Sequence, residues 1–202
     1  MTTSVPVIGQ RHLREAIPYR NTATIRTTDG LQTVRFTVRE YTGHSDPDLV
    51  YYSYYRDSIY QTQGGYHGQP LHGTYTERHS DGGLRVLGHY RYGIRQGRWQ
   101  YWDKSGKLRR VSHWKNGKET GTYASYGIDG ELRQLGYLCD GEFDGGIKSV
   151  NSDESETFIE IKYYNNGTEV DRAEVGFLKR FRFWLIQIKT AQKLSCKVKS
   201  SK

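Results

Sequence analysis

A repeat of 24 residues is the feature that most constrains the fold of this chain. Three consecutive copies run from Gly73 to Gly145, and the same kinds of residue recur at the same offsets in each. The aligned sets are Gly73, Gly97 and Gly121; Tyr75, Trp99 and Tyr123; Leu84, Leu108 and Leu132; Arg85, Arg109 and Arg133; Leu87, Val111 and Leu135; and Gly93, Gly117 and Gly141. A fixed period of this length is typical of proteins that stack one structural unit on the next.

Turn residues divide each copy into two strands. The first turn of each copy contains a glycine after a small polar residue, which favours positive φ and a tight connection between two strands. The second turn, at Asn116-Gly117 and Asp140-Gly141, returns the chain to the next hairpin. The first turns are Asp81-Gly82, Ser105-Gly106 and Asp129-Gly130. The sequence therefore predicts an all-β protein with an elongated, single-layer antiparallel sheet of repeated β-hairpins.

The apolar residues of a copy do not alternate strictly along the strand. Leu84 and Leu87, for example, lie three positions apart, whereas residues on one face of a regular strand lie two apart. A β-bulge produces this spacing, and so does a sheet that packs on both faces. The spacing alone leaves both explanations open.

The motifs of the second copy carry a resemblance to a known family. They read Gly-x-Trp-x-Tyr-Trp at 97–102, Ser-Gly-Lys-Leu-Arg at 105–109 and Trp-Lys-Asn-Gly-Lys at 114–118. This pattern resembles the MORN-repeat variant of bacterial antitoxin-type proteins. The resemblance implies an extended sheet of hairpins that associates with proteins, sometimes near membranes, and it implies no catalytic residues. It also implies an alternative function, an antitoxin or immunity-type protein that neutralises a cognate toxin by binding.

Four regions follow from the patterns along the chain. Residues 1–20 show no periodicity and contain two prolines, so we expect a loose N-terminal arm. Residues 21–48 alternate around Asp29-Gly30 and predict a hairpin that caps the open edge of the array. Residues 49–170 form the repeat array, including a degenerate first copy with a turn at Arg56-Asp57. Residues 171–202 form a basic, apolar tail.

All of the net positive charge lies in residues 177–202 of that tail. The chain carries 30 Lys and Arg against 22 Asp and Glu, and residues 177–202 hold eight Lys or Arg and no acid. The remaining 22 basic residues (30 − 8) balance the 22 acids. Basic residues mixed with aromatic ones suit the interface of an anionic membrane. Nucleic acid is not expected as a partner, because a basic face along the whole array would be needed for it.

An amphipathic helix is the favoured structure for the tail, although its β-branched and aromatic residues also permit a strand. On a helix, Phe177, Phe181, Trp184 and Ile188 share one face. Three roles stay open for the tail: anchoring at a membrane surface, docking on the repeat sheet, and insertion into a groove of a partner. The expected anchor residues are Phe177, Lys179, Arg180, Phe181, Arg182, Trp184 and Ile188.

No set of residues predicts an enzyme. His89 and His113 share one position in consecutive copies, which is more typical of packing than of catalysis, and no phosphate loop or zinc motif occurs. We expect no catalytic residue, no cofactor and no metal ion. A protein partner would instead meet the repeated aromatic and arginine rows. The candidate binding residues are Tyr75, Trp99, Tyr123, Arg85, Arg109 and Arg133.

The two cysteines, Cys139 and Cys196, lie far apart in sequence and favour a reducing compartment. The first residues lack the basic and apolar segments of a signal peptide, and no apolar run reaches the length of a membrane span. We therefore expect a cytoplasmic protein with a peripheral position at the inner face of the membrane.

Overall fold

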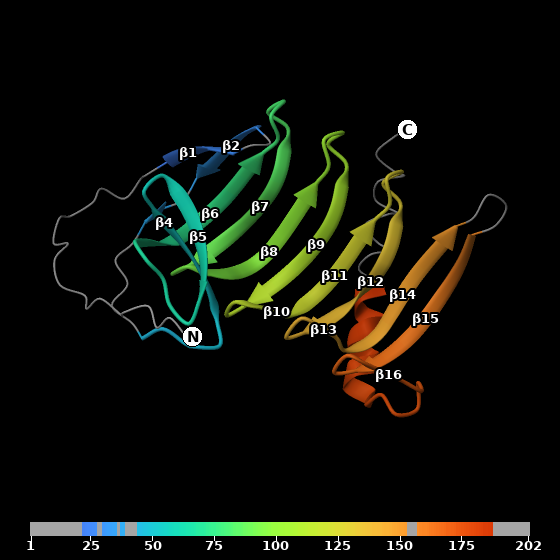
Figure 1. Ribbon diagram of the computed structural model, residues 1–202. Helices are drawn as coiled ribbons and strands as arrows, with labels where there is room; N and C mark the ends of the chain where they lie inside the picture. The colour runs from blue at the N-terminus through green and yellow to red at the C-terminus, as the bar shows by residue number, and fades with distance from the viewer. Residues whose placement is uncertain (1–21, 28–29, 36, 39–43, 153–156, 188–202) are drawn as a thin grey trace, which may run out of the picture.

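A computed structural model describes residues 22–27, 30–35, 37–38, 44–152 and 157–187. The predicted arm at 1–20 and residues 188–202 of the tail lie outside these residues. Figure 1 shows an elongated row of antiparallel strands with one helix near its C-terminal end. The strands are β1 (Thr22–Thr27), β2 (Gly30–Arg35), β3 (Thr37–Val38), β4 (Val50–Tyr55), β5 (Ser58–Gln63), β6 (Gln69–Arg78), β7 (Leu84–Arg91), β8 (Ile94–Trp102), β9 (Leu108–Lys115), β10 (Lys118–Glu119), β11 (Gly121–Tyr126), β12 (Leu132–Cys139), β13 (Glu142–Phe143), β14 (Gly145–Ser152), β15 (Thr157–Asn165) and β16 (Thr168–Val170).

The large sheet follows the order of the chain almost throughout. Its strands are arranged β16-β15-β14-β12-β11-β9-β8-β7-β6-β4-β5, and the short β10, β13 and β3 pair with β9, β12 and β6. Each 24-residue copy contributes one antiparallel strand pair, because neighbouring strands in sequence are neighbours in the sheet. The predicted all-β, single-layer array of hairpins, with an N-terminal hairpin and a short C-terminal helix, is confirmed.

The first turn of each copy is a tight loop with its glycine in the left-handed region. Residues 79–83 form a loop in which the Gly82 N–H donates to the His79 carbonyl at 2.9 Å and the His79 N–H donates to the Gly83 carbonyl at 2.8 Å. This is the pattern of a type I turn followed by a glycine in the left-handed region, and Gly82 has φ of 87°. Loops 103–107 and 127–131 share this pattern. The predicted turn glycines therefore do take positive φ, as Gly106 and Gly130 show with φ of 77° and 90°.

The second turns are the two-residue ones. Asn116 and Gly117 both have positive φ, 50° and 78°, and Lys115 pairs directly with Lys118 across them. This is the geometry of a type I′ turn, whose twist matches that of antiparallel strands. Each turn glycine also donates its N–H to the previous copy, as Gly117 does to the Arg95 carbonyl at 3.1 Å. These bonds join the turns of successive copies along one rim of the sheet.

A β-bulge explains the uneven apolar spacing. Between β8 and β9, Tyr101 pairs with Arg110 and Trp102 pairs with Leu108, so Arg109 has no partner in the ladder. The equivalent shifts in the other copies skip Arg85 and Arg133. The aligned arginines are thus the extra residues of the bulges, and a repeated bulge increases the local twist of the sheet.

The two faces of the sheet are covered differently along its length. We call the face that carries Tyr75, Tyr90 and Trp99 the aromatic face, and the opposite face, which carries Ala124 and Leu135, the helix face. The aromatic face forms a cluster in its N-terminal half, where side chains of the β4–β5 hairpin pack against it. The helix face forms a second cluster in the C-terminal half, which includes Ile186 of the C-terminal helix.

The N-terminal hairpin consists of β1 and β2, which pair from Thr22 with Arg35 to Thr27 with Gly30. It forms a separate two-stranded sheet. The chain then joins the array through β3, where Thr37 pairs with His72 and Val38 pairs with Leu71 on β6. The hairpin thus connects to the array at β6, whereas β5 and β16 are the terminal strands of the sheet order.

Candidate functional site

The C-terminal helix, residues 177–187, is held to the sheet by one ion pair at its start. The Lys179 ammonium lies 2.5 Å from the Asp144 carboxylate and donates to the Asn165 side-chain oxygen at 2.7 Å. Asp144 is buried, and a buried carboxylate needs an opposite charge or hydrogen-bond donors to offset its lost hydration. Lys179 therefore fixes the first turn of the helix beside β14 and β15.

Aromatic packing holds the rest of the inner face. Phe183 is 5% exposed and lies over Gly146, where an added Cβ would overlap the ring. Its ring also meets Tyr163 of β15 edge to face, with centroids 6.4 Å apart. Arg182 lies over the ring of Tyr137 at 4.2 Å, in cation–π geometry. Together these contacts use residues 179, 182, 183 and 186, which follow the spacing of one helical face.

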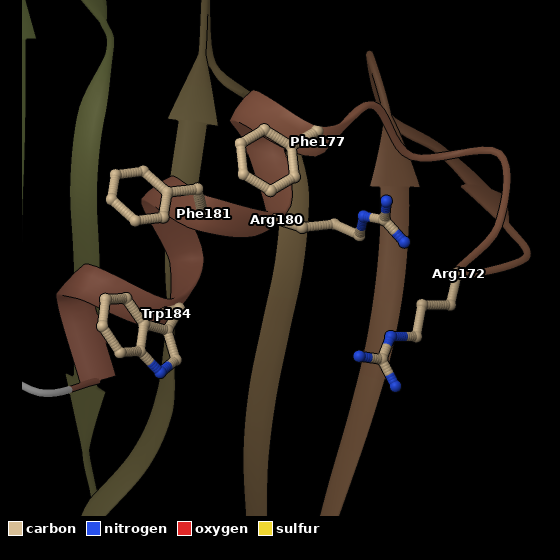
Figure 2. A pocket seen from close by; sticks show the side chains of 5 residues that line it. All are labelled: Arg172, Phe177, Arg180, Phe181 and Trp184. Atoms are coloured by element: carbon tan, nitrogen blue, oxygen red, sulfur yellow. The ribbon is translucent and has the colours of Figure 1, made fainter.

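The outer face of the same helix is apolar and exposed. Phe177, Phe181 and Trp184 are 69%, 45% and 54% exposed, and their rings stack in sequence with centroids 6.1 and 5.7 Å apart. Leu178 and Leu185 are exposed beside them. Figure 2 shows the three rings arranged along the helix. A contiguous exposed apolar patch of this kind marks an interaction surface, because its apolar area leaves water only when a partner covers it.

Two arginines border this patch. Arg172, before the helix, and Arg180, on it, line a shallow depression of about 440 Å³ together with the three rings. Figure 2 shows both guanidinium groups extending on one side of Phe177. No ion pair joins either arginine to an acid among the described residues. We name Phe177, Phe181, Trp184, Arg172 and Arg180 the helix patch.

The structure divides the predicted anchor residues between the two faces. Phe177, Arg180, Phe181 and Trp184 belong to the outer face, and Ile188 lies outside the described residues. Lys179 and Arg182 belong to the docked face, where they bind Asp144 and Tyr137. Arg172 was not among the predicted anchors, although its basic side chain five residues before Phe177 was a visible signal.

The predicted aromatic row has a structural role in its first two members. Trp99 is 1% exposed and Tyr75 is buried, and each pairs across strands with a small residue, Ser112 and Gly88. Trp99 also lies over Gly88, where a Cβ would overlap the indole. Tyr123 is partly exposed and meets Phe143 edge to face at 5.8 Å. Only Tyr123 of the row therefore offers a ring to a partner.

Two arginines of the predicted row form ion pairs with acids of their own copies. Arg85 lies 2.9 Å from the Glu77 carboxylate, and Arg133 forms an ion pair with Asp129. Arg109 has one buried guanidinium nitrogen with no hydrogen-bond partner. The row is thus not a uniform set of exposed cations.

Sequence reasoning missed Arg95, which lies within the aromatic face. Its guanidinium stands 4.9, 4.8 and 4.7 Å from the ring centres of Tyr52, Trp99 and Trp114. The aligned positions hold Leu71, Glu119 and Phe143, so the repeat gave no indication of a cation there. A cation among three rings stabilises the cluster through cation–π attraction.

The buried tyrosine hydroxyls of this cluster have raised pKa values. Burial raises the pKa of Tyr75 far above its usual range, and nearby Glu77 raises it further. Burial likewise raises the pKa of Tyr90, more than the charge of Arg95 lowers it. Both hydroxyls therefore stay protonated.

The two histidines considered for catalysis lie on neighbouring hairpins, His89 on β7 and His113 on β9. His113 Nδ1 lies 2.8 Å from the Thr122 carbonyl, and the His89 ring lies 6.4 Å from that of His72. Among the described side chains, no three His, Cys, Asp or Glu residues gather as metal ligands would. Within the same residues, no helix is long and apolar enough to cross a bilayer.

Comparisons with protein-family models, with curated proteins and with solved structures found no match for this chain. The resemblance to the MORN-repeat variant therefore stays a prediction from the motifs alone.

Proposed function

We propose that this protein is a non-enzymatic adaptor that binds an anionic membrane surface through the helix patch and a protein partner through its sheet. The observation that carries the proposal is the division of the helix into two faces. One face is fixed to the sheet by Lys179, Arg182 and Phe183, and the other exposes three stacked rings beside two arginines. A rigidly held aromatic face has little conformational entropy to lose on binding.

The composition of the patch suits the boundary between headgroups and acyl chains. Tryptophan and phenylalanine partition into this boundary, and guanidinium groups beside them meet lipid phosphates. Each arginine near an anionic surface contributes about 1 kcal/mol to the free energy of membrane binding. Beyond residue 187 the sequence adds five lysines and no acid, so the charge contribution increases along the chain. A patch of this size supports reversible, peripheral binding.

The partner surface is proposed for the middle of the aromatic face. Tyr101, Arg110 and Tyr123 are partly exposed there, and Arg110 binds the Glu119 carboxylate at 2.6 and 2.8 Å. Aromatic and arginine side chains are the types most enriched at protein interfaces. A pull-down from the native host tests this part. Capture of an envelope or structural complex supports the adaptor, and capture of a single toxic enzyme supports the antitoxin alternative.

Co-sedimentation with vesicles tests the membrane part. The intact protein is expected to bind vesicles that contain phosphatidylserine and to bind pure phosphatidylcholine vesicles much more weakly. Rising salt should reduce the binding, because it screens the arginine and lysine charges. The double variant Phe181→Ser with Trp184→Ser should lose the part of the binding that resists salt.

Two further variants sharpen this experiment. Arg172→Ala with Arg180→Ala should weaken binding mainly at low salt, because the aromatic rings remain. Ile128→Ser is the matched control, since Ile128 is an exposed apolar residue in the loop between β11 and β12. Absence of vesicle binding by the intact chain would reject the membrane part, and so would equal losses in the control and in the ring variant.

A further inference from the structure

The last long strand of the array has an open edge. Residues 157–164 of β15 pair with β14, from Thr157 with Ser152 to Tyr164 with Gly145. On its other side, β16 pairs only with residues 163–165. In earlier copies the strand after the two-residue turn continues along its neighbour, as β8 does along β7. No described strand occupies that position beside residues 157–162 of β15.

The turn at Asn166-Gly167 determines which backbone groups face this open position. Both turn residues have positive φ, 47° and 81°, and Asn165 pairs with Thr168 across them. The residues that flank such a turn exchange both of their backbone hydrogen bonds. Because hydrogen-bonding direction alternates along a strand, the N–H and C=O groups of every second residue before Asn165 also face outward. These are Tyr163, which pairs with Val170, and then Ile161, Ile159 and Thr157.

The side chains on this segment are also open to solvent. Phe158, Ile159 and Ile161 are 54%, 58% and 44% exposed, although all three are large and apolar. Protein sheets normally protect such edges with prolines, with bulges or by covering them, because a bare apolar edge pairs readily with another strand. Ile159 and Ile161 therefore combine outward-facing backbone groups with exposed apolar side chains.

We propose that this edge is a homodimer interface, in which β15 pairs antiparallel with β15 of a second copy about a two-fold axis through Ile159. In that register Ile159 lies opposite the partner's Ile159, and Thr157 lies opposite the partner's Ile161. Thr157, Ile159 and Ile161 thereby all exchange backbone hydrogen bonds with the partner. A two-fold interface needs a single self-complementary surface, and this segment supplies one.

The charged side chains of the segment are compatible with this pairing. Glu160 and Lys162 lie on one face of β15, and their side chains are 3.7 Å apart. Lys162 also lies 3.4 Å from Glu169 of β16. In the dimer the two Glu160 carboxylates lie diagonally across the axis, and the charge of each is already offset by Lys162 of its own chain.

The other terminal strand does not offer the same surface. β5 has the sequence Ser-Ile-Tyr-Gln-Thr-Gln, which is mostly hydroxyl and amide side chains. Pairing of β15 with β5 of the next copy would also be head-to-tail and would extend into a filament, whereas pairing of β15 with itself closes after two copies. The geometry therefore favours a dimer of defined size.

Sedimentation equilibrium of the full chain tests the proposal. The wild-type protein is expected to show a mass of two chains that falls to one chain on dilution. Ile159→Pro should be monomeric and should melt at the temperature of the dilute, monomeric wild-type protein, because it removes an outward N–H that the chain itself does not use. Ile161→Lys should also be monomeric, and it covers the case in which the proline variant fails to fold.

A substitution at an exposed isoleucine away from the edge serves as the control for these variants. Ile128→Lys makes the same exchange at an exposed isoleucine in a distant loop and should leave the dimer intact. A wild-type protein that is monomeric at every concentration would overturn the proposal. So would a dimer that survives in both edge variants, or one that Phe181→Ser with Trp184→Ser dissolves, since the helix patch would then be the interface. Masses that rise beyond two chains would indicate head-to-tail pairing instead.

Discussion

The two halves of the sheet carry their apolar clusters on opposite faces, although they are built from the same 24-residue unit. In the N-terminal half, Trp99 and its neighbouring tyrosines fill the aromatic face, and the β4–β5 hairpin packs against them. In the C-terminal half, Val111, Ala124 and Leu135 fill the helix face, and Ile186 of the C-terminal helix packs against them. A thin sheet has no interior of its own, so each half needs a different segment of the chain to cover it.

Small residues determine which face of the sheet accepts a ring. Gly88 leaves room for Trp99 on the aromatic face. On the helix face, Gly146 leaves room for Phe183, whereas the aligned positions in earlier copies hold Thr74, Arg98 and Thr122. A side chain at position 146 would hold the helix away from the sheet. A single departure from the repeat therefore creates the docking site for the tail.

The largest expected effect comes from Trp99→Ala, which removes the centre of the aromatic cluster. The indole contacts Tyr75 and Tyr90, with ring centroids 5.7 and 5.0 Å apart, and its removal leaves a cavity that the sheet cannot close. We expect a loss of about 4 kcal/mol in the free energy of unfolding. Urea denaturation measures it. A loss below about 1 kcal/mol would show that the aromatic face is not the core of its half.

Phe183→Ala should cost less and should act only on the C-terminal half. Loss of this buried ring is expected to reduce stability by about 3 kcal/mol, because the helix loses its main apolar contact with Gly146 and Tyr163. Hydrogen exchange should rise in residues 177–187 and stay unchanged in β7 and β8. Equal rises in both halves would contradict the view that the two cores are separate.

Lys179→Met should weaken helix docking by about 2 kcal/mol, since it leaves the buried Asp144 carboxylate without its cation. The effect is expected to be smaller than that of a fully buried pair, because the lysine is partly exposed. Thermal unfolding measures the change. The double variant with Asp144→Asn should recover part of the lost stability, and absence of any recovery would argue against the ion pair as the cause.

Arg85→Ala should have the smallest effect, about 1 kcal/mol or less. The arginine side chain is 43% exposed, so water screens its attraction to Glu77. The comparison with Arg133→Ala, whose partner Asp129 is more exposed, sharpens this point. The Arg85 variant should lose the more stability of the two. If chemical denaturation shows a larger stability loss for Arg133→Ala than for Arg85→Ala, the burial of Glu77 does not strengthen its ion pair.

The repeat and its hairpins could be predicted because their signals are local. Glycine and asparagine at the turns carry the positive φ that the backbone needs, and the period places one strand pair in each copy. The length of the loop at Asp81-Gly82 could not be read in the same way. A glycine with positive φ serves both a two-residue turn and the bulge that ends a longer loop, and cross-strand pairing decides between them.

The helix patch could be predicted only in part. The sequence showed the aromatic and basic stripe of the tail, but the face that docks depends on residues distant in the chain, as Lys179 and Asp144 are 35 positions apart. Arg95 was missed for a related reason. Its place among three rings follows from strand pairing and the folded β4–β5 hairpin, neither of which a single repeat position reveals.

The fluorescence of Trp184 offers the most direct test that the outer face of the helix meets lipid while the inner face stays on the sheet. The difference between the emission spectra of wild-type protein and Trp184→Phe gives the emission of Trp184. With vesicles that contain phosphatidylserine, this emission should shift to shorter wavelength. Brominated lipid in the vesicles should quench it. Hydrogen exchange at the Phe183 side of the helix should stay protected in the same samples. A Trp184 signal that neither shifts nor is quenched, although the protein sediments with the vesicles, would contradict the proposed membrane contact.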